Sequence, residues 1–168
     1  MSALFLLALA LGGEGEPFLQ PGDPLWVGHG MAEGYGLPFL AKLTVKKVRY
    51  LIMNEARVVF EENPKRPYYL RTDLGPNYAF LTDPRQTYAF TPEQWEDIRR
   101  GRIEIGMSKL MFLCIKPRPE EAFTVADEKG PIEQWVYRAE PVQLFGDLKQ
   151  NPPTNIYYFQ NNVLVAIL

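Results

Sequence analysis

The sequence has few of the residues from which most catalytic and metal sites are built. Its 168 residues include one Cys and one His. A single Cys excludes a disulfide within the chain, and a single His excludes a metal site made of several imidazoles. The net charge of -2 is not that of a polycation, so we expect no nucleic-acid partner. The composition therefore argues against an enzyme, and we expect neither a cofactor nor a metal.

The two reactive side chains have simple structural interpretations. His29 stands between Gly28 and Gly30, which favours a solvent-facing turn over a metal ligand or a general base. Cys114 stands in the apolar run Leu110–Ile115, which favours a small buried hydrophobe over a reactive thiolate. Neither residue has a partner close in the sequence with which it could form a catalytic pair.

Long apolar runs are also scarce. The run Ala3–Leu11 has nine residues, whereas a helix that crosses a bilayer needs about 20. Small and acidic residues follow it up to Pro17, which is typical of a signal peptide, although no Cys comes directly after it to accept a lipid. We interpret residues 1–16 as a signal-peptide-like segment and expect an exported, periplasmic or outer-membrane-associated protein. The alternative is an uncleaved apolar helix, and membrane association would then run through that segment or be indirect.

Proline, glycine and aromatic residues are abundant, with 15 Pro, 13 Gly and 13% aromatics. This mixture favours short strands joined by turns. Between residues 17 and 90 we expect five or six strands, at 25–27, 39–45, 47–53, 57–60, 68–71 and 78–81. Clusters of Gly, Pro, Asn and Asp separate them, including a glycine-rich turn at 28–36. The segment 17–90 is therefore predicted to form a small β-barrel of the SH3-like kind.

The pattern changes from strand to helix at residue 91. The run Thr91–Gln94 has a hydroxyl at the N-cap, Pro at the first helical position and Gln at the third, which predicts a capping box. Trp95 would lie on the apolar face, and Gly101 would end the helix in a left-handed conformation. Ser108 is expected to cap a second short helix that ends before Pro117.

Strands are expected again in the last part of the chain. The segments 132–138 and 155–167 are rich in aromatic and β-branched residues. Asn161 and Asn162 predict a two-residue type I′ hairpin within the second segment, because asparagine tolerates positive φ. The stretch 139–154 should run over the surface. The order from residue 91 is then helix, helix and three strands.

Four segments of the second half share their order and spacing with one known family. They are WEDI at 95–98, GRIEIGMS at 101–108, QWVY at 134–137 and YYFQNNVL at 157–164. They resemble the SmpA/OmlA-type (BamE-like) domain of bacterial outer-membrane assembly lipoproteins, with the motif carried by Trp95, Gly101, Gly106, Met107 and Ser108. The resemblance covers residues 91–168. It implies an α+β layer of two short helices packed on a three-stranded antiparallel sheet, which binds envelope proteins without catalysis.

Aromatic side chains are the best candidates for a binding surface, because Tyr and Trp are enriched where proteins meet. Within the hairpin, Tyr157 and Phe159 share one face and Tyr158 takes the other. The sequence leaves open which of these faces is exposed. The candidates for an aromatic surface are Trp26, Tyr68, Tyr69, Trp135, Tyr137, Tyr157 and Tyr158.

These observations predict a non-enzymatic, exported protein of the bacterial cell envelope that acts as a protein-binding or assembly module. Its partners would be envelope proteins. The alternative is a module that binds peptides or cell-wall ligands through the SH3-like barrel of residues 17–90. A cluster of cations is best interpreted as a solvated face, with an anionic partner or headgroup surface as the less favoured hypothesis; it comprises Lys42, Lys46, Lys47 and Arg49.

Overall fold

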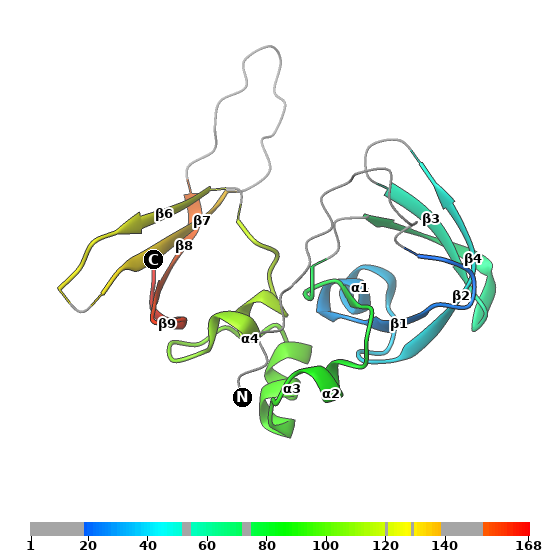
Figure 1. The fold of residues 1–168 in the computed structure, drawn as a ribbon, viewed down its shortest axis with the longest axis horizontal. Helices are drawn as coiled ribbons and strands as arrows, with labels where there is room; N and C mark the ends of the chain where they lie inside the picture. The colour runs from blue at the N-terminus through cyan, green and yellow to red at the C-terminus, as the bar shows by residue number, and fades with distance from the viewer. Residues whose placement is uncertain (1–18, 52–54, 72–74, 120, 129, 139–152) are drawn as a thin grey trace, which may run out of the picture.

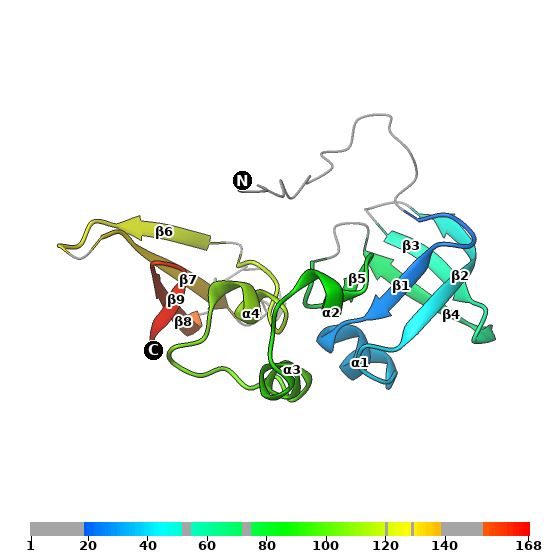
Figure 2. The same cartoon turned by 60° about the horizontal axis from the view of Figure 1, so that its bottom comes forward.

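The structure is a computed structural model that describes residues 19–51, 55–71, 75–119, 121–128, 130–138 and 153–168. Two antiparallel sheets lie at opposite ends of the molecule, with short helices between them (Figure 1 and Figure 2). The signal-peptide-like segment 1–16 and the connection 139–152 lie outside the described residues. Within the described ranges, no helix is both long and apolar enough to cross a membrane.

The first sheet has five strands in the order β4-β3-β2-β1-β5 and curves as a half-barrel around an apolar core. Every pairing is antiparallel. A short helix, α1 (His29–Tyr35), follows the first strand. The strands are β1 (Pro24–Val27), β2 (Lys42–Tyr50), β3 (Glu55–Phe60), β4 (Asn63–Arg71) and β5 (Ala79–Phe80).

The expected SH3-like barrel is wrong, because β4 and β5 are the two edges of an open sheet and do not pair with each other. Two local expectations also fail here. The strands expected at 39–45 and 47–53 are one strand, β2, with a bulge at Lys46. The glycine-rich segment 28–36 forms α1 instead of a turn, and Gly36, with φ +66, caps its end. A bulge bends one strand sharply, and the sequence pattern does not distinguish this bend from a break.

Three short helices follow, α2 (Pro84–Thr87), α3 (Pro92–Arg99) and α4 (Lys109–Leu113). The capping box of α3 is confirmed: Thr91 Oγ1 accepts from the Gln94 N–H at 3.2 Å, and Gln94 Oε1 accepts from the Thr91 N–H at 2.9 Å. Ser108 caps α4 as expected, since its Oγ accepts from the Met111 N–H at 3.2 Å. These bonds satisfy amide groups that have no partner within a helix.

The second sheet has four strands in the order β6-β7-β8-β9. They are β6 (Glu121–Val125), β7 (Ile132–Arg138), β8 (Pro153–Gln160) and β9 (Val163–Ile167). The predicted hairpin is confirmed, because Gln160 pairs with Val163 while Asn161 and Asn162 have φ of 51° and 63°. Both asparagines thus take the left-handed conformation that a type I′ turn requires.

The expected layer of two helices on a three-stranded sheet is also wrong. The strand β6 adds a fourth member to the sheet, and α3 and α4 pack their aromatic side chains against different surfaces. Through Phe112, α4 packs on the second sheet. Trp95 of α3 instead packs among rings from the first half of the chain, at centroid distances of 5.1 to 6.4 Å from Phe39, Phe80, Tyr88 and Phe90. The apolar face of α3 was evident from its sequence, but the surface that covers it was not.

His29 ties α1 to the end of α3, and the expectation of a solvent-facing histidine is wrong. Its side chain is buried, with 8% exposed. Nδ1 lies 3.3 Å from the Arg99 carbonyl oxygen, and Nε2 lies 3.5 Å from Glu33 Oε2. The ring rests on Gly101, where an added Cβ would lie 2.8 Å from the imidazole Cε1. Gly101 also has φ +64, so both its space and its backbone exclude a larger residue.

We predict that Gly101→Ala lowers the free energy of unfolding by about 1–3 kcal/mol. Part of this cost is the left-handed backbone, and part is the contact with the His29 ring. In a His29→Ala background the second part disappears, so the added cost of Gly101→Ala should be smaller there. Urea unfolding of the two single variants and the double variant measures the coupling. Equal costs in both backgrounds would show that the ring contact contributes nothing.

Candidate functional site: the open edge and face of the second sheet

One face of the second sheet is closed by an aromatic cluster around Phe112. The Phe112 ring lies 5.8 Å from Trp135, 4.8 Å from Tyr157 and 5.1 Å from Phe159, measured between ring centroids. All four side chains are buried. Their edge-to-face geometry adds to the gain from burying apolar area. The helix α4 is therefore held firmly on this face.

Polar contacts fix the position of α4 along the sheet. Lys109 Nζ donates to Glu133 Oε1 at 2.6 Å and lies 5.0 Å from the centroid of the Trp135 ring. Trp135 Nε1 donates to Glu133 Oε2 at 3.3 Å. Hydrogen bonding from the Lys109 ammonium holds the pKa of Glu133 below its usual range. The start of α4 is thus tied to β7 by charge as well as by packing.

The opposite face of this sheet is partly exposed. In β6, Phe123 and Val125 pair with Gln134 and Ile132, which alternate with Trp135 and therefore point away from Phe112. Phe123 is 52% exposed and Val125 is 53% exposed. We give the name open face to six apolar side chains on this side that are at least partly exposed: Phe123, Val125, Ile132, Ile156, Tyr158 and Val163; Val136, on the same side, is buried.

The outer edge of β6 is open as well. Figure 1 shows β6 at the far side of the sheet, away from the helices. In the part of the chain that the structure describes, β6 forms backbone hydrogen bonds with β7 and none along its other edge. Edge strands are commonly protected by Lys, Pro or a bulge, and Ala122–Val125 has none of these.

Two other strand edges in the molecule are closed in part by specific contacts. Gly106 donates its N–H to the Leu164 carbonyl of β9 at 2.8 Å, and the Leu164 N–H donates to the Met107 carbonyl at 2.8 Å. On β4, the Tyr35 hydroxyl donates to the Tyr69 carbonyl at 2.7 Å and accepts from the Tyr69 N–H at 3.1 Å. The strand β6 therefore differs from β4 and β9, because among the described residues its outer edge forms no backbone hydrogen bond.

The strand β6 is held rigidly although its edge is open. At its start, Arg138 donates two hydrogen bonds to the Glu121 carboxylate, at 3.0 and 2.9 Å, and they lower the pKa of Glu121. Beyond its end, Gln160 Nε2 donates to Asp127 Oδ1 at 3.2 Å. A strand anchored at both ends loses less conformational entropy when a partner pairs with it.

The aromatic candidates from the sequence are mostly inside the molecule. Tyr137 is half-buried and donates its hydroxyl to the Pro117 carbonyl at 2.6 Å. Tyr158 is half-buried on the open face, and Tyr69 is 50% exposed on the first sheet, far from it in the fold. Four candidates lie in the cores: Trp26, Tyr68, Trp135 and Tyr157.

The motif residues of the second half support the fold. Met107 is buried, Ser108 caps α4, and Gly106, with φ +94, directs its N–H to β9. Trp95 fills the cluster beside the first sheet, and Gly101 faces His29. In this chain they position α3, α4 and β9.

Phe123 and Val125 are not among the candidates predicted from the sequence, because their segment is not one of the three strands expected after residue 91. The signal that could have found them is the run AFTVA at 122–126, which combines β-prone residues with no charge. Such a run on a strand without edge protection is typical of a surface that pairs with another chain.

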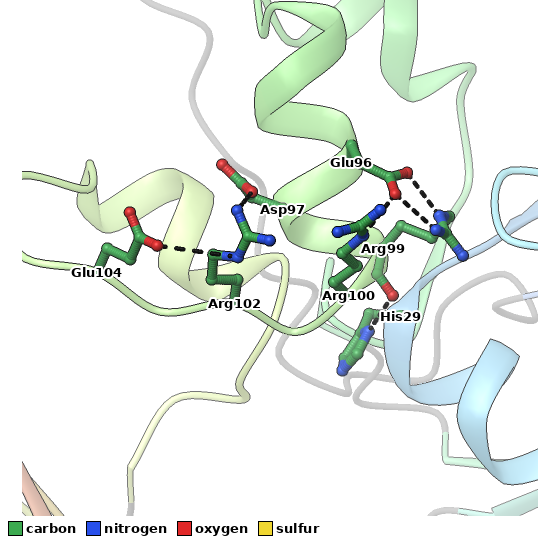
Figure 3. A network of polar contacts seen from close by, with 7 residues as sticks. All are labelled: His29, Glu96, Asp97, Arg99, Arg100, Arg102 and Glu104. Carbon is green, nitrogen blue, oxygen red and sulfur yellow. Dashed lines mark hydrogen bonds and ion pairs between the residues drawn. The ribbon is translucent and has the colours of Figure 1, made fainter.

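A second polar cluster surrounds α3, but its charges satisfy one another (Figure 3). Glu96 accepts from Arg99 and from Arg100, each at 2.6 Å, and Arg102 donates to Asp97 at 2.9 Å. Hydrogen bonding from Arg99 lowers the pKa of Glu96 to about 2. An open hollow lies beside this cluster, lined by Pro92, Glu93, Glu96, Asp97, Arg100 and Arg102. Because these groups are paired with one another, they have little hydrogen-bonding capacity left for a ligand.

The reactive side chains are buried at separate places. Cys114 is fully buried, and this burial raises the pKa of its thiol to about 12. His29 is bound between α1 and α3. Among the described residues, no group of three or more His, Cys, Asp or Glu side chains could hold a metal ion.

Comparisons with protein-family models, with curated proteins and with solved structures gave no match. The resemblance to the SmpA/OmlA-type domain therefore stays a prediction. The open edge of β6 and the open face remain the features of this structure from which a binding function can be argued.

We predict that Cys114 in the native protein does not react with a thiol-specific disulfide reagent at about pH 8, because burial keeps its thiol protonated. Denaturant should expose the thiol and give one equivalent of product per chain. The absorbance of the released thiolate follows the reaction. Rapid reaction of the native chain would contradict the buried position of Cys114.

We predict that acid weakens the fold partly through Glu96. Folding lowers its pKa from the usual 4.5 to about 2, so its stabilising effect is complete above pH 4.5 and is lost as the pH falls towards about 2. The variant Glu96→Gln lacks this titration and should lose less stability over the same range. Thermal unfolding at several pH values tests this difference. Parallel curves for the two proteins would contradict it.

Proposed function

We propose that this chain is a non-enzymatic protein-binding module that pairs an extended segment of a partner protein with the outer edge of β6. The observation that carries the proposal is the outer edge of β6, which forms no backbone hydrogen bond among the described residues. Backbone N–H and C=O groups on such an edge accept another strand, and main-chain hydrogen bonds then supply much of the affinity.

The side chains beside this edge define the partner further. A strand added to β6 extends the open face, and its alternate side chains come next to Phe123 and Val125. The partner segment should therefore carry apolar residues at every second position. Ile132, one strand further in, continues this apolar surface.

The absence of catalysis is part of the proposal. The only imidazole and the only thiol of the chain, in His29 and Cys114, are both buried. The charged side chains on α3 and directly after it form ion pairs with one another. These facts favour binding over chemistry.

The cell envelope is the proposed place of action. The apolar run Ala3–Leu11 and the resemblance of residues 91–168 to an envelope domain support export, with envelope proteins as partners. The alternative, peptide or cell-wall binding through the first sheet, has less support, because Trp26 and Tyr68 are buried there instead of lining an aromatic groove.

A site-specific crosslink tests the proposed edge. With benzoylphenylalanine in place of Phe123, irradiation of cells that express the chain should yield an adduct of discrete mass. A second substitution, Val125→Lys, places a charge beside the edge and should reduce that adduct severalfold. Gel mobility and mass spectrometry of the adduct measure both effects.

The matched control places the same crosslinker at Leu81, which is also exposed but follows β5 of the first sheet. No adduct, or the same adduct from both positions, would refute the proposal. An adduct of twice the chain's own mass would replace the partner protein by a second copy of this chain.

A further inference from the structure

The outer side of the first sheet carries a compact group of cations. Along β3, Ala56, Val58 and Phe60 are buried, so Arg57 points outward. Its register partner on β2 is Arg49, and Lys47 lies two residues before Arg49 on the same side. All three cations are exposed, and none has an ion-pair partner among the described residues. Glu55, on the same side, lies opposite Arg71.

An exposed aromatic ring completes this surface. Tyr69 of β4 is the register partner of Arg57 and is 50% exposed. Tyr35 binds both backbone groups of Tyr69 and so fixes the strand from which this ring projects. We call the group of Lys47, Arg49, Arg57 and Tyr69 the cationic face.

The arrangement of the cationic face is unfavourable for the folded chain alone. Arg49 and Arg57 are directly opposite each other, and like charges at such positions destabilise a sheet. The chain as a whole has a net charge of -2, so the positive charge of this surface is opposite in sign to the net charge of the protein. A loss of folding stability from such a like-charge pair is expected where a surface serves a function.

We propose that the cationic face binds the anionic lipid headgroups of a membrane surface. It lies on the convex side of a half-barrel, with the apolar core on the other side. A convex surface can approach a broad anionic plane without obstruction, and its three cations can lie near several headgroups at once. Tyr69 adds an amphipathic ring of the type that is enriched at the level of headgroups.

Single-stranded nucleic acid fits the same surface less well. Proteins that bind it combine a positive groove with several aromatic rings on which successive bases stack. The cationic face lies on a convex sheet and offers a single exposed ring, Tyr69. The geometry therefore favours a plane of charge over a strand of bases.

Vesicle co-sedimentation of the full chain tests the proposal. Vesicles of phosphatidylserine and phosphatidylcholine in equal parts should bind the chain, and more salt should weaken this binding. The double variant R49Q/R57Q should bind roughly 25-fold more weakly, at about fivefold for each lost cation. Vesicles of phosphatidylcholine alone give the background contributed by the rest of the chain.

The matched control is R85Q/R118Q, which removes the same charge from exposed arginines outside the first sheet. It should bind within about twofold of the original chain. The unfolding midpoint of R49Q/R57Q should rise by roughly 1–3 °C, because the like-charge pair is gone. This rise shows that weaker binding does not come from a damaged fold.

Equal losses for the two double variants would overturn the proposal, because net charge and not the cationic face would then decide binding. The same conclusion follows if anionic vesicles bind no better than the background. Tighter binding to a single-stranded oligonucleotide than to anionic vesicles, lost in R49Q/R57Q, would assign the face to nucleic acid and refute the membrane proposal. None of these outcomes depends on β6, so the proposed protein-binding function stands or falls separately.

Discussion

The burial of the Phe112 ring decides how the second half of the molecule is built. This ring lies against Trp135, Tyr157 and Phe159 and attaches α4 to one face of a four-stranded sheet. The same core continues through Ile98 of α3 to Trp26 and Phe80 of the first sheet. One cluster therefore joins the two sheets, and it leaves Phe123 and Val125 exposed on the opposite face of the second sheet.

The outer strand edges of the two sheets differ in how far they are covered by hydrogen bonds. The edge of β9 is closed by the chain segment before α4, and β4 is closed at Tyr69 by a tyrosine hydroxyl. At the far end (Figure 1), the outer edge of β6 forms no backbone hydrogen bond among the described residues, and the strand carries the exposed side chains Phe123 and Val125. The cationic face lies at the other end, on the first sheet. Two surfaces of different chemistry thus lie at opposite ends of the molecule.

Local features of the fold could be predicted because they depend on neighbouring residues. The capping box at Thr91, the cap at Ser108 and the turn at Asn161 involve groups a few residues apart, and all three are confirmed. The closed barrel and the helical layer failed because they depend on distant contacts. The bulge at Lys46, for example, is visible only when β2 is paired with β3.

The same distinction governs the candidate site. By itself, the sequence determined that successive side chains of a predicted strand point to opposite faces. Tyr157 and Tyr158 must therefore lie on opposite faces. The tertiary structure alone decided that Tyr157 is buried under α4 and that Phe123 is exposed on the opposite face of the sheet. The alternation of side chains is a property of every extended backbone. Burial depends on which helix covers a face, and this is decided by contacts between residues that are far apart in the chain.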